Sequence, residues 1–77
     1  MPKYPISEQM QKRLENDYTY HAPKEDQPAR YQTIRDYGKA LAMVIMQETP
    51  VSREQSVALT LLDECLMAAN AAIARNE

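Results

Sequence analysis

"TPVSREQ", residues 49–55, decides how this chain folds, because it ends one helix and begins the next. Pro50 has no backbone N–H to donate and therefore stops a helix that reaches it. Ser52 followed by Gln55 has the spacing of a capping box, which marks the N-terminus of a new helix. We therefore predict two helices joined by a tight turn, which makes them antiparallel neighbours.

The helix before this turn is predicted over about residues 28–48. Pro28 suits the first turn of a helix, with Asp26 or Gln27 as the N-cap. Gly38 lies inside this helix, where it costs about 1 kcal/mol relative to alanine. Close approach of another backbone or of a ligand would explain such a glycine, and we favour packing against the second helix.

The helix after the turn is predicted over about residues 53–75, and its apolar side is wide. No charged residue lies between Glu64 and Arg75. Because one neighbouring helix cannot cover so wide a face, we expect a homo-oligomer. Asn70 either fixes the register of a helix interface or is a hydrogen-bonded core residue. Two apolar rows make up the face: Leu59, Leu62, Leu66, Ala69 and Ile73, beside Leu61, Cys65, Ala68 and Ala72.

The N-terminal part predicts a third, short helix at about residues 7–16. Met10 and Leu14 give it a narrow apolar stripe, so the helix is marginal alone and must pack on something. Residues 17–27 contain aromatic residues and proline but no sustained alternation of apolar and polar residues, which indicates an ordered loop. The expected fold is all-α, with a short N-terminal helix plus a long antiparallel helical hairpin, assembling as a compact homo-oligomer.

The composition limits the functions open to such a chain. Seventy-seven residues form one small domain, residues 1–77, near the size at which a single core barely supports folding. A net charge of −2 argues against binding DNA or RNA, while one histidine and one cysteine argue against a closed zinc site and an internal disulfide. We expect no metal and no cofactor. No signal peptide is visible, and the least polar stretch, 65–74, is expected to be too short to span a bilayer, so no membrane partner is predicted.

The stretch "DYTYHAPKEDQPARY", residues 17–31, holds three of the five tyrosines, the only histidine and two of the five prolines. Tyrosine rings can stack on purine bases while lysine and arginine meet phosphates. Lys24, Arg30 and Arg35 supply such cations in or near this stretch. The cluster therefore indicates a site for a small, flat, anionic ligand.

Other interpretations of the same residues stay open. Tyr18 and Tyr20 could cover the hairpin core, and Pro23 could merely stiffen the turn. His21 could act as a general base, but no nucleophile or set of metal ligands accompanies it. We therefore expect that the protein is not an enzyme.

A second group of candidates lies on the helix after the turn. Arg53 in its first turn opposes the helix dipole, and an anion bound at the N-terminus would offset that cost. Thr60, about two turns further, either shares this surface or is a plain helix-face threonine. Arg75 lies near the C-terminus of the helix, where a cation interacts favourably with the helix dipole, so it needs no role in binding. In an oligomer it could also reach into a neighbour's loop.

Three motifs, "YTYHAPKEDQPARY", "SREQSVALT" and "NAAIAR", occur in this order and spacing over residues 18–75. Together they resemble the phage anti-CBASS cyclic-nucleotide sponges, and the related Thoeris-inhibiting sponges of phages carry a similar hairpin domain. The resemblance implies a compact hexamer that binds cyclic dinucleotides such as 3′,3′-cGAMP between protomers. Some members of the family also bind cyclic trinucleotides. It also implies sequestration without cleavage, in the cytoplasm of the infected bacterial host, so that the CBASS effector is not activated.

The resemblance further implies which residues bind the ligand, without assigning each to a pocket. They come from all three motifs and the first long helix: Tyr20, His21, Pro23, Lys24, Arg35, Ser52, Arg53, Thr60, Asn70 and Arg75. Two positions depart from the family pattern. Ala68 replaces an aromatic residue, and Glu25 stands where a smaller or turn-favouring residue is expected.

Three alternatives to this function remain. The hairpin could bind a host or phage protein directly, or the protein could be a sponge for the cyclic ADP-ribose isomers of Thoeris signalling. A phosphodiesterase would release linear product, but the sequence offers no metal-ligand set for one.

Overall fold

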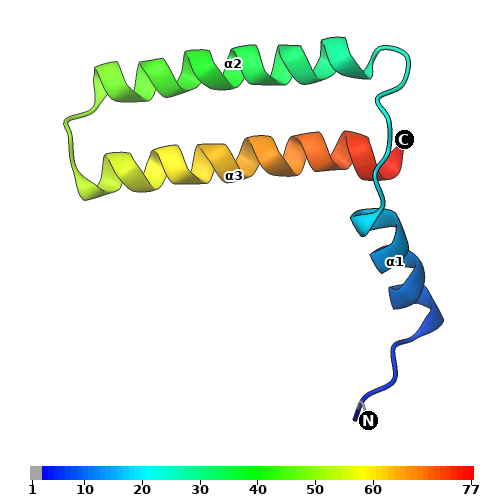
Figure 1. The fold of residues 1–77 in the computed structure, drawn as a ribbon. Helices are drawn as coiled ribbons and strands as arrows, with labels where there is room; N and C mark the ends of the chain where they lie inside the picture. The colour runs from blue at the N-terminus through cyan, green and yellow to red at the C-terminus, as the bar shows by residue number, and fades with distance from the viewer. Residues whose placement is uncertain (1–2) are drawn as a thin grey trace.

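The computed structural model describes residues 3–77 as three helices, and this part of the chain contains no strand. The helices are α1 (Glu8–Tyr18), α2 (Gln27–Glu48) and α3 (Arg53–Asn76). Figure 1 shows α2 and α3 side by side and antiparallel, with α1 projecting away from them near the C-terminal end of α3. The predicted all-α helical hairpin is confirmed.

The helix ends differ from the expected ones by one or two residues. α1 continues to Tyr18, beyond the predicted end at residue 16, so the linker between α1 and α2 consists of residues 19–26. Asp26 is the N-cap of α2 but makes no side-chain capping hydrogen bond, and proline lies in the first turn as expected. Ends of helices commonly shift by this much because they fray.

The turn between α2 and α3 is held by its own polar groups. Ser52 Oγ accepts a hydrogen bond from the Gln55 backbone N–H at 3.1 Å, which is the predicted cap. The Gln55 side chain does not return to Ser52, as a full capping box requires. It donates instead to the backbone carbonyl and the hydroxyl of Thr49, both at 3.1 Å. These bonds join the end of α2 to the start of α3.

Gly38 is buried where α2 meets α3. A Cβ built on Gly38 would lie 2.5 Å from Cδ1 and 2.8 Å from Cδ2 of Leu66. These distances are below van der Waals contact, so a larger residue at this position would force the Leu66 side chain to move. The expected reason for the glycine, helix packing, is confirmed.

The hairpin is a single layer of helices with almost no interior. The Cα atoms span 51 × 37 × 14 Å, and Ile73 is the one buried hydrophobic residue among residues 3–77. The 8.8 kDa chain exposes 6726 Å². A folded monomer of this mass exposes roughly 4,800 Å², so about 1,900 Å² is in excess. Stable domains usually need a second packed layer, which this chain alone does not supply.

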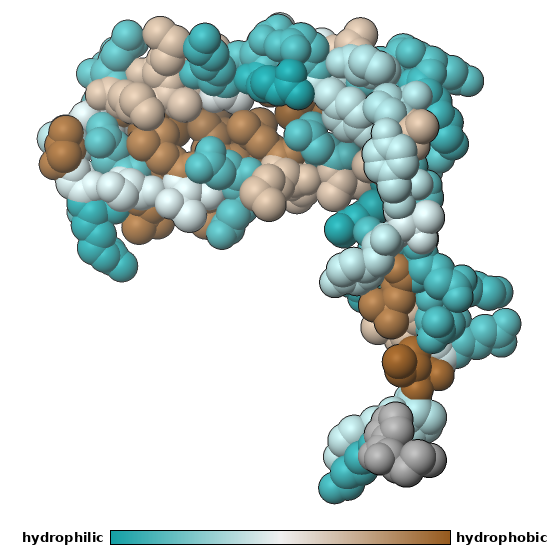
Figure 2. All heavy atoms as spheres, viewed as in Figure 1, coloured by the Kyte–Doolittle hydropathy of each residue, from teal (hydrophilic) through white to brown (hydrophobic). Residues whose placement is uncertain are grey.

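An apolar groove runs between α2 and α3, with a volume of about 370 Å³. Figure 2 shows the apolar side chains gathered along the hairpin and a further apolar patch on α1. Cys65, which belongs to the second apolar row of α3, lines the groove and is exposed in the single chain. The residues that line this α2–α3 groove are Thr33, Ile34, Tyr37, Gly38, Leu41, Leu62, Cys65, Leu66 and Ala69.

The expectation that no segment is long enough to span a bilayer is wrong for α3. By length and composition alone, the whole helix Arg53–Asn76 qualifies as a membrane span, and 6% of its apolar window is buried. The sequence-based judgement considered only residues 65–74, whereas the helix extends on the N-terminal side through Asp63 and Glu64 into further apolar residues. A single helix of this kind is weak evidence for a membrane, because helices that pack in soluble cores share these properties.

Candidate ligand-binding site

The linker, residues 19–26, closes on itself before α2 begins. The backbone N–H of Gln27 donates to the carbonyl of Lys24 at 2.8 Å, and the Lys24 N–H donates to Gln27 Oε1 at 3.0 Å. Glu25 between them has a φ of 47°. This left-handed conformation suits glycine or asparagine better than glutamate, which gives a physical reason why a smaller or turn-favouring residue is expected at this position.

His21 fastens the linker to the end of α1. Its Nε2 lies 2.8 Å from the Asn16 backbone carbonyl, so Nε2 carries the proton that is donated. Asn16 in turn donates from Nδ2 to the Arg75 carbonyl at 3.0 Å. The Arg75 guanidinium lies 3.7 Å from Asp17, whose side chain is mostly buried. These contacts bring α1, the linker and the end of α3 into one corner of the molecule.

Glu77, which follows α3, contacts the linker and the first turn of α2 in the same corner. Arg30 makes a two-bond ion pair with its carboxylate, with nitrogen–oxygen distances of 2.8 and 2.5 Å. Gln27, which is buried, donates to the same carboxylate at 3.2 Å, and Lys24 Nζ donates to the Glu77 backbone carbonyl at 3.2 Å. The hydrogen bond from Arg30, with that from Gln27, lowers the pKa of Glu77 to about 2. The same pairing raises the pKa of Arg30.

A polar recess lies among these groups, with a volume of about 40 Å³. This space holds one or two waters or a small ion, whereas sites for organic ligands usually measure ~300 Å³ or more. A ligand as large as a cyclic dinucleotide therefore needs a further surface to enclose it. The recess is lined by Asn16, His21, Ala22, Lys24, Gln27, Tyr31, Ala74, Arg75 and Glu77.

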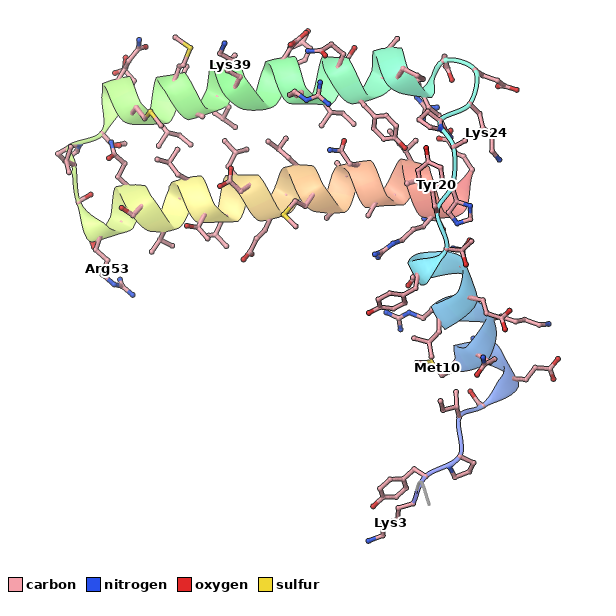
Figure 3. All side chains as sticks on the ribbon, in the orientation of Figure 1. Lys3, Met10, Tyr20, Lys24, Lys39 and Arg53 are labelled. Atoms are coloured by element: carbon pink, nitrogen blue, oxygen red, sulfur yellow. The ribbon has the colours of Figure 1, made fainter. Side chains whose placement is uncertain are left out.

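Five of the ten sequence-predicted site residues gather at this end of the hairpin. His21, Lys24 and Arg75 line the recess. Tyr20 and Pro23 lie on the same linker, and the Tyr20 ring is 84% exposed, so it is open for stacking. Figure 3 shows Tyr20 and Lys24 on the linker beside the end of α3.

Ser52 and Arg53 lie at the opposite end of the hairpin. Ser52 caps α3, and Arg53 is exposed with no ion-pair partner among residues 3–77. Figure 3 shows Arg53 pointing away from the hairpin. At 1.5 Å per residue, Arg53 and Arg75 are about 33 Å apart along α3. One chain cannot bring both arginines to one small ligand.

The other three predicted residues lie along the helices. Arg35 is exposed on α2 and donates to Gln32 at 2.7 Å, and Thr60 is exposed on α3. Asn70 is half-buried, and its Oδ1 is buried with no hydrogen-bond partner among the described residues. The interpretation of Asn70 as a hydrogen-bonded core residue is therefore wrong within the single chain.

Asn16, Gln27 and Glu77 were missed as site residues by sequence reasoning. Gln27 was considered only as a possible N-cap, and neither Asn16 nor Glu77 belongs to the three motifs. They come together with Lys24 because the hairpin returns the chain to its linker, and no local spacing reveals that contact.

Comparison with known proteins gives one family. Residues 10–74 match the family described as "Acb2/Tad1, hairpin domain", a range that runs from α1 almost to the end of α3. Neither the curated proteins nor the solved structures give a match to the chain. The matched range covers most of the chain and includes the linker and both helices of the hairpin. The chain belongs to the Acb2/Tad1 hairpin-domain family.

Proposed function

We propose that this protein is a phage anti-defence sponge that binds cyclic dinucleotides such as 3′,3′-cGAMP and releases them unchanged. It acts in the cytoplasm of the infected bacterium, where it withholds the signal from the CBASS effector. The observation that carries the proposal is the match of residues 10–74 to the Acb2/Tad1 hairpin family. Cyclic trinucleotides and cyclic ADP-ribose isomers are the related ligands to test beside 3′,3′-cGAMP.

The linker corner has the groups that such a ligand requires. Tyr20 offers an exposed ring for a base, and the Lys24 ammonium donates to the Glu77 carbonyl but makes no ion pair with a side-chain carboxylate among residues 3–77. Arg75 is held only by Asp17 at 3.7 Å, a distance at which a phosphate can compete for it. Binding by these groups needs no catalytic residue, which fits a protein that stores its ligand.

The pocket is completed by other copies of the chain in this proposal, and a hexamer is the assembly that we propose. The polar recess of about 40 Å³ is too small for the ligand, while about 1,900 Å² of surface is in excess. A second copy would enclose the ligand and cover apolar surface together. It would also supply a donor to the buried Oδ1 of Asn70.

Replacing Tyr20 with alanine tests this function against the main alternative, a hairpin that binds a partner protein. The sponge loses one stacked base, worth about 1–3 kcal/mol, so affinity for 3′,3′-cGAMP should fall by roughly 5- to 150-fold. Tyr4→Ala is the matched control, because Tyr4 is also exposed but lies outside the matched range. Equal affinity of both variants and the unmodified protein, measured by calorimetry, would reject the proposed site.

A further inference from the structure

Two apolar surfaces of this chain have no partner within it. One is the α2–α3 groove, with its volume of about 370 Å³ and no charged residue in its lining. The other is the stripe along α1 formed by Ile6, Met10 and Leu14, which are 61%, 44% and 38% exposed. These residues are spaced by four, so they lie on one side of the helix, with Ile6 just before its N-cap. A convex apolar stripe and a concave apolar groove are complementary in shape and polarity.

The stripe cannot reach the groove of its own chain without breaking the linker corner. Asn16 and Asp17, in the last turn of α1, are tied to Arg75 at the end of α3, and His21 is tied back to Asn16. Figure 1 shows α1 projecting away from the hairpin, and Figure 3 shows Met10 on α1 at a distance from both hairpin helices. The groove is centred on the middle of α2 and α3, well away from this corner.

The excess surface has the size of a contact between proteins. About 1,900 Å² per chain is more than the ~800 Å² per partner that a standard interface buries. A pair of copies that exchange α1 covers the groove and the stripe on each copy, because the same contact is made twice about a two-fold axis. A small ligand in the groove would leave the α1 stripe in water.

We propose that α1 of one copy packs its apolar stripe into the α2–α3 groove of a second copy, which returns the same contact. The inference rests on the homo-oligomer of the proposed function and names the surfaces that join its copies. It also gives α1, which makes few contacts with its own hairpin, a structural role as an exchanged arm.

The single cysteine of the chain, Cys65, lines the groove and provides the test. A tagged chain with Leu14→Cys and Cys65→Ala is co-expressed with the untagged, unmodified chain, so that each chain carries one cysteine. Oxidation then links residues 14 and 65 only if their Cα atoms, one from each chain, approach to within ~7 Å. Lys12→Cys with Cys65→Ala is the matched control, because Lys12 lies on the opposite side of α1.

The expected product is a tagged–untagged pair joined through residues 14 and 65, formed at least ~10-fold more than with the Lys12→Cys control. A yield no higher than the control, or a main product joined through Cys65 of two unmodified chains, would overturn the exchange. Light scattering on the same samples separates the two proposals. An intact oligomer without the 14–65 link rejects only the arm exchange, whereas a monomer rejects the oligomer of the proposed function as well.

Discussion

The two ends of the hairpin are built from different kinds of contact. At the turn, Ser52, Gln55 and Thr49 bond one another within seven residues of chain. At the linker end, hydrogen bonds join residues 47 to 59 positions apart, such as Arg30 with Glu77 and Asn16 with Arg75. The turn thus defines the fold locally, while the linker end exists only once the hairpin has closed. We infer that the turn end is structural and the linker end binds the ligand.

The largest expected effect is on ligand affinity, and it is tested by replacing one cation at each end of the hairpin. Lys24→Ala removes an ammonium from the linker, and a lost charge-assisted hydrogen bond to a phosphate costs about 1.5–3 kcal/mol, or roughly 10- to 150-fold in affinity. Arg53→Ala at the turn should change affinity for 3′,3′-cGAMP by less than about threefold if its end of the hairpin is structural. Isothermal titration calorimetry measures both. Equal losses would show that both ends contribute to ligand binding, and the comparison drawn above would be wrong.

A substitution at the turn should lower the stability of the protein without changing its ligand affinity. Ser52→Ala removes the acceptor for the Gln55 N–H and should lower the free energy of unfolding by about 1 kcal/mol. Chemical denaturation at fixed protein concentration measures this loss, since an oligomer's stability depends on concentration. Ser56→Ala, one turn into α3, is the control. A fall in ligand affinity without a fall in stability would instead assign Ser52 to the binding site.

The contacts at the linker end should make the stability of the protein depend on pH in the acid range. The folded pKa of Glu77 is about 2, below its ordinary value of 4.5, so its stabilising effect is full above pH 4.5 and is lost as the pH falls towards 2. Glu77→Gln should flatten this part of the pH dependence of unfolding. Glu54→Gln, at the turn end and without an ion-pair partner among residues 3–77, should leave it unchanged. The same acid sensitivity in all three proteins would show that the Arg30–Glu77 pair does not hold the corner.

The smallest effect concerns the linker backbone. Glu25 has a φ of 47°, a conformation that costs a side-chain-bearing residue about 1–2 kcal/mol and costs glycine nothing. Glycine loses about 0.5–1 kcal/mol of that advantage through its freer unfolded chain. Glu25→Gly should therefore raise the midpoint of thermal unfolding slightly, whereas Glu25→Ala should not. A gain with alanine as large as with glycine would point to the charge of Glu25 as the cause.

The sequence predicts one end of the molecule better than the other for the same physical reason. Ser52, Pro50 and Gly38 act through neighbours in the chain or through one repeating helix contact, so the caps, the turn and the hairpin could be predicted. Gln27 and Glu77 meet across the closed hairpin, 50 positions apart, and no pattern of spacing predicts that pair. Residues 17–31 predicted a ligand site at the linker, but their pattern did not reveal that the recess there is too small for a cyclic dinucleotide.

The most direct test of the central claim is a calorimetric titration of the purified chain with 3′,3′-cGAMP, followed by denaturation and chromatography of the released ligand. A sponge whose pockets lie between copies should bind no more than one ligand per chain and return the cyclic dinucleotide intact. Absence of binding to 3′,3′-cGAMP, or recovery of a linear product, would contradict that account.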